Sequence, residues 1–254
     1  MLVTFGSGVL IGKRTDIANS TPEPFAVLQE VDIDFDFTNK PLYGLNQFPV
    51  FTARGEGKIT GKAKWGSISG GLMNAMFFGQ TLTTGGTQLA ANETHTVPAS
   101  TPFTISPTNQ ASFAGDEGVQ YVTLPPHPLT LTTGAPGTIA FYDPPAAGTS
   151  TGTYLFNSND ASTQVYLNYL YTTSAGQNIA MANVILGTTP YFQAVFRNRD
   201  PKTGLFNTLI LNRCISNKLA YSSKTTDYGI PELDFEAVDD GTSNIGTWTM
   251  GDLS

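Results

Sequence analysis

The 254-residue chain has few of the side chains from which most metal and catalytic sites are built, with one cysteine and two histidines. A single cysteine excludes an internal disulfide framework and a cysteine-rich metal site, and two histidines argue against a histidine-based one. Charged residues make up only 13% of the chain, and no apolar run approaches the roughly 18 residues of a membrane span. Hydrophobic residues at 40% are too many for disorder. The composition predicts a soluble, β-rich protein that is not an enzyme.

Basic residues are missing from the middle of the chain. All 13 lysines and arginines lie at or before Lys64 or at or after Arg197, and the stretch between them carries five acids. We interpret this shift as an insertion at 80–187 within a more charged core formed by 1–79 and 188–254. The alternative is one continuous domain with a polar, uncharged middle. A net charge of −7 argues against a nucleic-acid grip, which needs clustered lysine and arginine.

Two segments near the N-terminus have the alternating pattern of half-buried strands. From Glu30 to Thr38, apolar side chains alternate with acids, and from Val50 to Trp65 small and apolar side chains alternate with mostly basic ones. Antiparallel pairing of these strands sets acids against bases. Glycines on the apolar face of the second strand leave room for a bulky group, or permit a bend.

The segments that follow these strands have different periods. Asn39 to Pro49 is expected to be a loop that packs on its own domain or docks on a neighbour, because it combines prolines with apolar side chains. Ser67 to Phe78 predicts a short amphipathic helix, with Ser67 or Ser69 as the cap and Gly79 as the stop. Its apolar face is expected to pack on the glycine-bearing side of the preceding strand.

The rest of the chain predicts further strands. In the core, Tyr191–Asn198 and Leu205–Ile215 form a hairpin through an Asp-Pro turn, followed by a strand at 232–237 and a last one near 247–250. In the insertion, the spacing predicts a small sandwich-like element with strands at 119–124, 129–132, 138–142, 153–156 and 165–171.

No motif in the sequence supports catalysis or cofactor binding. Gly6 to Arg14 fits neither a phosphate loop nor a dinucleotide fingerprint and is interpreted as a flexible N-terminal arm. His95 and His127 lack a recognisable nucleophile and orienting acid. Asp116-Glu117 is expected in a solvated turn, and Cys214 as a buried, inert thiol in a strand. We therefore expect no catalytic residue, no cofactor and no metal.

One long segment resembles a known family. Leu45 to Gly79, LNQFPVFTARGEGKITGKAKWGSISGGLMNAMFFG, resembles the strand–helix core of phage tail tube proteins of the siphophage type. The pieces Gly8–Gly12, Thr21-Pro22 and Val31–Phe35 are similar to the openings of major tail proteins. In the middle, Gly152–Phe156, Asp160 and Val165–Tyr171 resemble a β motif of phage structural proteins. The resemblance covers about half of the chain in pieces.

The resemblance implies a mainly β fold with two packed antiparallel sheets, one short helix and a β-rich insertion exposed on the outside of a tube. Six copies form a ring whose inner sheets join into one barrel, and the rings stack into a conduit for DNA ejection. The implied partners are further copies, the tape-measure, tail terminator and distal tail proteins, and double-stranded DNA that passes without specific binding. The protein is then assembled in the host cytoplasm, resides in the virion and does not enter membranes.

Two sets of residues carry the implied roles. The candidates for the lumen are Asp32, Asp34, Asp36, Arg54, Glu56, Lys58 and Lys62. The candidates for contact between rings are Lys40, Leu42, Tyr43, Leu45 and Phe48. The alternative for the first set is a polar face that simply looks outward. The alternative function is a phage or prophage adhesion or decoration protein whose insertion binds a host-surface glycan, and an enzyme such as a hydrolase is a third.

Overall fold

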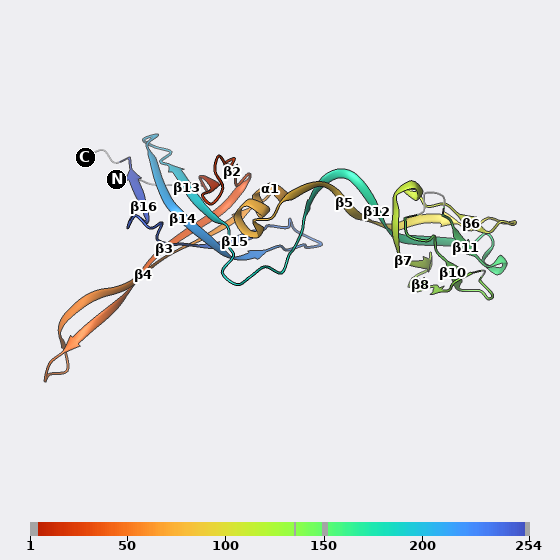
Figure 1. Cartoon of the computed structure of the whole chain (residues 1–254), viewed down its shortest axis with the longest axis horizontal. Helices are drawn as coiled ribbons and strands as arrows, with labels where there is room; N and C mark the ends of the chain where they lie inside the picture. The colour runs from red at the N-terminus through yellow and green to blue at the C-terminus, as the bar shows by residue number, and fades with distance from the viewer. Residues whose placement is uncertain (1–4, 135, 149–151, 252–254) are drawn as a thin grey trace. The chain divides into compact units, whose positions relative to one another are not determined.

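The computed structural model describes residues 5–134, 136–148 and 152–251. The protein is mainly β, with several antiparallel sheets and one short helix, as the sequence predicts (Figure 1). The chain divides into two compact units, a core unit of residues 1–82 and 179–254 and an inserted unit of residues 83–178. Among the described residues, no helix is long and apolar enough to cross a membrane.

The core unit is built on one large sheet that folds over on itself. Its strands run in the order β2-β1-β13-β14-β15-β4-β3, and β16 also pairs with β14. One edge of β14 pairs with β16 at 207–211 and with β15 at 214–220, so this strand leads from one layer into the other. The strands are β1 (Val9–Arg14), β2 (Glu23–Pro24), β3 (Leu28–Tyr43), β4 (Pro49–Trp65), β13 (Tyr191–Arg199), β14 (Phe206–Ala220), β15 (Glu232–Ala237) and β16 (Gly246–Met250).

Aromatic contacts show that the two layers pack face to face. Phe192 of β13 meets Phe235 of β15 with ring centres 5.8 Å apart, and Phe35 of β3 stacks on Trp248 of β16 at 5.4 Å. The predicted Asp-Pro hairpin is confirmed, because β13 pairs antiparallel with β14. The prediction of a flexible N-terminal arm is wrong for part of this segment, because β1 pairs with β13 and Leu10 is buried in the core. Burial removes the apolar side chains of this segment from water, which stabilises the fold.

The predicted helix forms at the expected place, as α1 (Gly70–Met73) followed by the π-helix η1 (Asn74–Phe78). The Leu72 amide donates to Ser69 Oγ (3.3 Å), and Gly79 ends the helix with φ 66°. Its partner differs from the expected one. Met76 occupies the space above Gly12 of β1, so a side chain there would collide with it. Two glycines of β4 instead accommodate phenylalanine rings, Gly57 that of Phe37 and Gly61 that of Phe235.

The inserted unit contains two four-stranded sheets, in the orders β5-β12-β7-β8 and β6-β11-β10-β9. Most predicted strands are present with shifted bounds, but the long strand β5 was not predicted, because its polar residues lack a clear alternation. A separate core of tyrosine, phenylalanine and aliphatic side chains holds the unit together. The strands are β5 (Leu82–Thr96), β6 (Thr104–Ile105), β7 (Phe113–Tyr121), β8 (His127–Pro128), β9 (Thr130–Leu131), β10 (Phe141–Asp143), β11 (Tyr154–Phe156) and β12 (Gln164–Ile179). Short 3₁₀ turns lie at η2 (Gln110–Ser112) and η3 (Ser158–Asp160).

Candidate assembly surfaces

Four strands of the core unit share one face of alternating charge. β3 and β4 pair antiparallel with acids opposite bases, Asp32 against Lys62 and Asp36 against Lys58, as the sequence predicts. The ladder continues onto β15 and the end of β14, which the sequence analysis did not connect with it. The ion pairs on this face are Lys58–Glu236 (3.3 Å), Lys62–Glu232 (3.1 Å), Lys64–Glu30 (2.5 Å), Lys218–Glu232 (2.8 Å) and Lys218–Asp234 (3.5 Å).

The charges on this face interact, but they add little stability. Hydrogen bonding to Lys64 lowers the pKa of Glu30, and hydrogen bonding to Lys218 lowers the pKa of Glu232. Because the lysine side chains are between a third and a half exposed, water and salt screen these pairs, and each contributes little to stability. The acids on the face outnumber the bases. The face is therefore a hydrated surface with an excess of negative charge, and it contributes little to the stability of the fold.

One of the lumen candidates does not belong to this face. The register of β3 and β4 shifts between Phe37 and Asn39, so that a β-bulge forms in β4 at Gly55 and Glu56. The next side chain, Arg54, is turned to the opposite face, where its guanidinium carbon lies 4.7 Å from the centre of the Phe37 ring. A strict alternation predicted Arg54 beside Lys58, and a single extra residue reverses that assignment.

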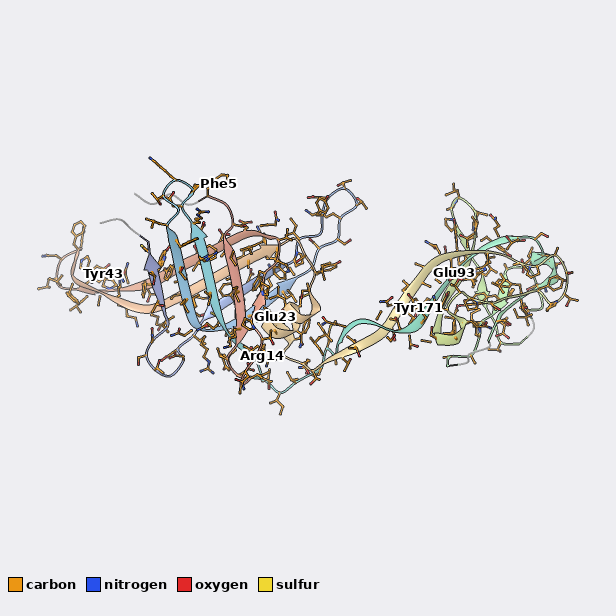
Figure 2. All side chains as sticks on the ribbon, turned by 90° about the horizontal axis from the view of Figure 1, so that it is seen from above. Phe5, Arg14, Glu23, Tyr43, Glu93 and Tyr171 are labelled. Atoms are coloured by element: carbon orange, nitrogen blue, oxygen red, sulfur yellow. The ribbon has the colours of Figure 1, made fainter. Side chains whose placement is uncertain are left out.

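The segment expected as a loop at 39–49 is mostly strand. β3 continues to Tyr43 and β4 begins at Pro49, so only residues 44–48 connect the two strands. Lys40, Leu42 and Tyr43 therefore lie on β3, and Figure 2 shows Tyr43 near the end of this hairpin. Pairing of the two strands satisfies the backbone N–H and C=O groups of this segment, which in a long loop would have to bond water instead.

The end of the hairpin carries apolar side chains that the chain itself does not cover. Leu45 is fully exposed and Phe48 is 83% exposed, and four further apolar side chains of this end are more than half exposed. The four are Leu42, Tyr43, Val50 and Phe51. An apolar cluster of this size on a protruding element is typical of a contact with another protein.

The outer edge of β3 is open. β3 is the last strand in the order of the sheet, and none of the described strands pairs with its free edge. With 16 residues it is much longer than the short edge strands with which proteins usually avoid further pairing. Its unpaired amides and carbonyls are available to a strand of another chain.

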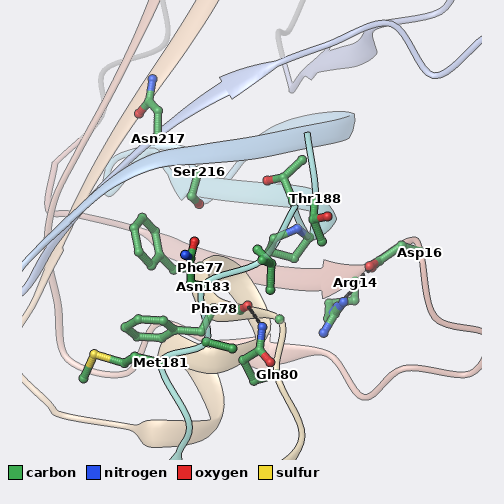
Figure 3. Close-up of a pocket in the computed structure, with 15 residues that line it drawn as sticks. Arg14, Asp16, Phe77, Phe78, Gln80, Met181, Asn183, Thr188, Ser216 and Asn217 are labelled. Carbon is green, nitrogen blue, oxygen red and sulfur yellow. Dashed lines mark hydrogen bonds and ion pairs between the residues drawn. The ribbon is translucent and has the colours of Figure 1, made fainter. Parts of the chain in front are cut away.

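One cavity of the core unit has a lining that does not suggest acid–base chemistry. It has a volume of about 590 Å³ and lies beside the end of η1, the segment 181–190 and β14 (Figure 3). Phe77, Phe78 and Met181 supply apolar surface. Arg14 and Asp16 form a two-pronged ion pair, and this hydrogen bonding lowers the pKa of Asp16. Because the charges of Arg14 and Asp16 offset each other, this lining is better suited to contact with apolar groups than to acid–base chemistry.

The residues considered for catalysis lie apart from these surfaces. Cys214 is buried, as predicted, and burial raises the pKa of its thiol to about 12. His95 bonds Glu93 (2.5 Å) in the inserted unit, and His127 is exposed on β8. Asp116 is not in a solvated turn: it lies in β7 and accepts hydrogen bonds from the hydroxyls of Tyr142 (2.7 Å) and Tyr154 (2.8 Å).

No protein-family model matches the chain, and no curated protein matches it.

Proposed function

We propose that this protein is a structural subunit of a phage tail tube, which assembles from copies of itself into stacked hexameric rings and conducts DNA during ejection. The observation that carries the proposal is the open 16-residue edge of β3 in a sheet with a charged face. A sheet with one long open edge is completed by a strand from a neighbouring copy, and ring closure then removes every such edge.

The two faces of the β3–β4 pair have different roles in such a ring. The apolar face packs into the core of the subunit, so the charged face is the one left for the lumen. Asp32, Asp34, Asp36, Glu56, Lys58 and Lys62 then line the channel. Paired acids and bases give DNA no continuous basic track to bind, and the excess of acids repels phosphate over about 8 Å.

The hairpin end provides the contact between rings. Leu45 and Phe48 are exposed in the isolated chain, and burial of both against another ring removes apolar surface from water. We propose that Lys40, Leu42, Tyr43, Leu45 and Phe48 form this contact. Tape-measure, terminator and distal tail proteins are then the partners at the ends of the tube, and the virion is the location.

The test is the assembly state of the purified chain. We expect rings or long hollow tubes in negative stain and a mass of several subunits in light scattering. The variant Phe48→Asp should keep the fold and lose the long tubes, because it places a charge in the contact between rings. Leu124→Asp, at a fully exposed position of the inserted unit, is the matched control and should still form tubes. A chain that stays monomeric at high concentration would contradict the proposal.

A further inference from the structure

A second stretch of exposed apolar side chains lies beside the cavity of the core unit at η1. Met181 is 83% exposed, Ile185 is 85% exposed and Leu186 is 99% exposed. Met181 and Val184 also line the cavity. We call residues 181–186 the apolar segment. Exposed apolar side chains that gather beside a cavity are typical of a contact with another protein.

The backbone of the apolar segment has a defined turn. The Thr188 amide donates to the Ile185 carbonyl (3.1 Å), and Gly187 has φ 89°. This hydrogen bond closes a tight turn that holds Leu186 at its tip. Because the turn is already formed in the single chain, less conformational entropy is lost when a partner packs on it.

The opposite wall of the cavity is also formed in the single chain. The buried Asn74 fixes the residue that follows the helix, since its side chain donates to the Gln80 carbonyl (2.6 Å) and accepts the Gln80 amide (3.0 Å). Phe77 and Phe78 pack edge to face with ring centres 5.2 Å apart, and both line the cavity (Figure 3). The cavity therefore offers a preformed apolar surface next to the apolar segment.

The end of the β3–β4 hairpin, residues 42–51, cannot fill the cavity of its own chain. β4 leads from Pro49 at this hairpin end to Trp65, which shares a core cluster with Met76 of η1. At about 3.3 Å per residue, a strand of 17 residues covers roughly 50 Å. Figure 2 shows Tyr43 of the hairpin end far from Arg14, which lines the cavity. A hairpin end that fills this cavity therefore belongs to another copy.

The two surfaces match in chemistry. Residues 177–196 and 42–53 contain no charged side chain, and Arg14 and Asp16 of the cavity already pair with each other. Contact between the surfaces therefore removes apolar side chains from water without burying an unpaired charge. Since the two surfaces differ, the contact is heterologous, and it repeats from copy to copy along a line.

We propose that the hairpin end of one copy packs into the cavity, and against the apolar segment, of a copy in the next ring. The inference rests on the proposed tube function and names the surface that receives the hairpin end. Each copy then presents one surface upward and the other downward, as unlimited stacking of rings requires.

Photo-cross-linking on the full chain tests which surfaces meet. Phe48→p-benzoylphenylalanine keeps an aromatic ring at the hairpin end and reacts on illumination with C–H groups that it contacts. We expect a cross-linked dimer whose link maps by mass spectrometry to residues 181–186 or to Phe77 and Phe78 of a second copy. Leu124→p-benzoylphenylalanine, at a fully exposed position of the inserted unit, is the control and should not link to these residues.

A charge in the apolar segment tests its contribution to stacking. Leu186→Asp should raise the protein concentration needed for tube formation at least about tenfold, with an unchanged circular dichroism spectrum. Leu124→Asp is the matched control, because Leu124 and Leu186 are both 99% exposed, and it should form tubes like the parent chain. A mixture of Phe48→Asp and Leu186→Asp retains one intact pair of surfaces, so it should form paired rings in negative stain but no long tubes.

Two results would overturn this contact and leave the tube function standing. One is that Leu186→Asp forms tubes at the same concentration as the parent chain. The other is that the cross-links from position 48 map elsewhere, for example to the hairpin end of a second copy. A parent chain that stays monomeric would overturn the tube function and this contact together, so the two failures are distinguishable.

Discussion

The two units of this chain differ in what their charged side chains contact. The core unit has an interior of aliphatic and aromatic side chains, and its acids pair with lysines on an exposed face. The inserted unit has no lysine or arginine, and three of its acids turn inward to tyrosine hydroxyls. Four hydrogen bonds join these acids to tyrosines: Asp116 to Tyr142 and Tyr154, Asp160 to Tyr121, and Glu93 to Tyr169.

This difference separates two ways of specifying a β structure. Exposed ion pairs fix which face of a sheet is polar, at little gain in stability. Hydrogen bonds to partly buried carboxylates are stronger and cost more to break, so they help to fix which strands lie together. The core unit is thus specified by its packing and by a charged surface, and the inserted unit by its packing and by a polar network.

The largest effect is expected from Trp65→Ala in the core unit. Trp65 is buried and packs edge-on against Phe25 with ring centres 5.2 Å apart. Removal of the indole leaves a cavity and should lower the free energy of unfolding of this unit by about 3–5 kcal/mol. Differential scanning calorimetry should show an earlier transition for the core unit and an unchanged one for the inserted unit. Trp248→Ala, at a half-exposed indole, serves as the control with a smaller loss.

A smaller effect, confined to the other unit, is expected from Tyr154→Phe. The change removes one of the two hydroxyls that bond Asp116 and leaves a carboxylate oxygen without its partner. The inserted unit should lose about 1–3 kcal/mol of unfolding free energy in chemical denaturation. Tyr171→Phe, whose hydroxyl bonds Gln88 at the surface, should change it little. Equal losses from the two variants would show that the buried network is not what specifies this unit.

Alkaline pH should destabilise the inserted unit more than the core unit. Burial and the neighbouring Asp116 raise the pKa of Tyr142 and Tyr154, and burial does the same for Tyr121 and Tyr169. A raised folded pKa gives stability that is complete below the unfolded pKa of about 10 and is lost as the pH rises above it. In the core unit, Cys214 is the buried group with such a shift among the described residues. The loss from Cys214 begins at its lower unfolded pKa of about 9, but four tyrosines contribute in the inserted unit. Melting between pH 9 and pH 11 should therefore lower the inserted unit's transition further than that of the core unit by pH 11, and equal shifts at pH 11 would refute this.

The smallest effect is expected on the charged face. Lys58→Ala removes the ion pair with Glu236 (3.3 Å) at an exposed position. The core unit should change by less than about 1 kcal/mol in urea unfolding, and added salt should reduce the difference further. A loss as large as that of Trp65→Ala would mean that the face contributes to the stability of the single chain.

Much of the core unit follows from local sequence patterns. Period-two alternation located the middle of β3 and most of β4 and set acids opposite bases, and the Asp-Pro turn located the β13–β14 hairpin. Ser67 or Ser69 was expected as the helix cap, and the structure has Ser69 there and Gly79 at the end of the helix. These features depend on near neighbours in the chain or on a regular period. The mainly β class is confirmed for the same reason.

The predictions that were wrong concern features that depend on contacts between distant parts of the chain or on one irregular residue. The bulge in β4 breaks the period that placed Arg54 on the charged face. Leu10 is buried because β13, far along the chain, pairs with β1. Asp116 was expected in a solvated turn, because the sequence around it gives no sign of Tyr142 and Tyr154, which bond it from distant strands. The tube and the lumen remain proposals.

The chain enters and leaves the inserted unit along two neighbouring strands. β5 begins at Leu82, β12 ends at Ile179, and the two pair in one sheet. A side chain at Gly86 would lie 3.4 Å from Asn178, so the incoming and outgoing backbones are close at that point. Excision of the whole unit would leave two ends that a short turn could rejoin. The arrangement makes the unit an exchangeable cassette, one that evolution or an engineer can replace without redesigning the sheet that receives it.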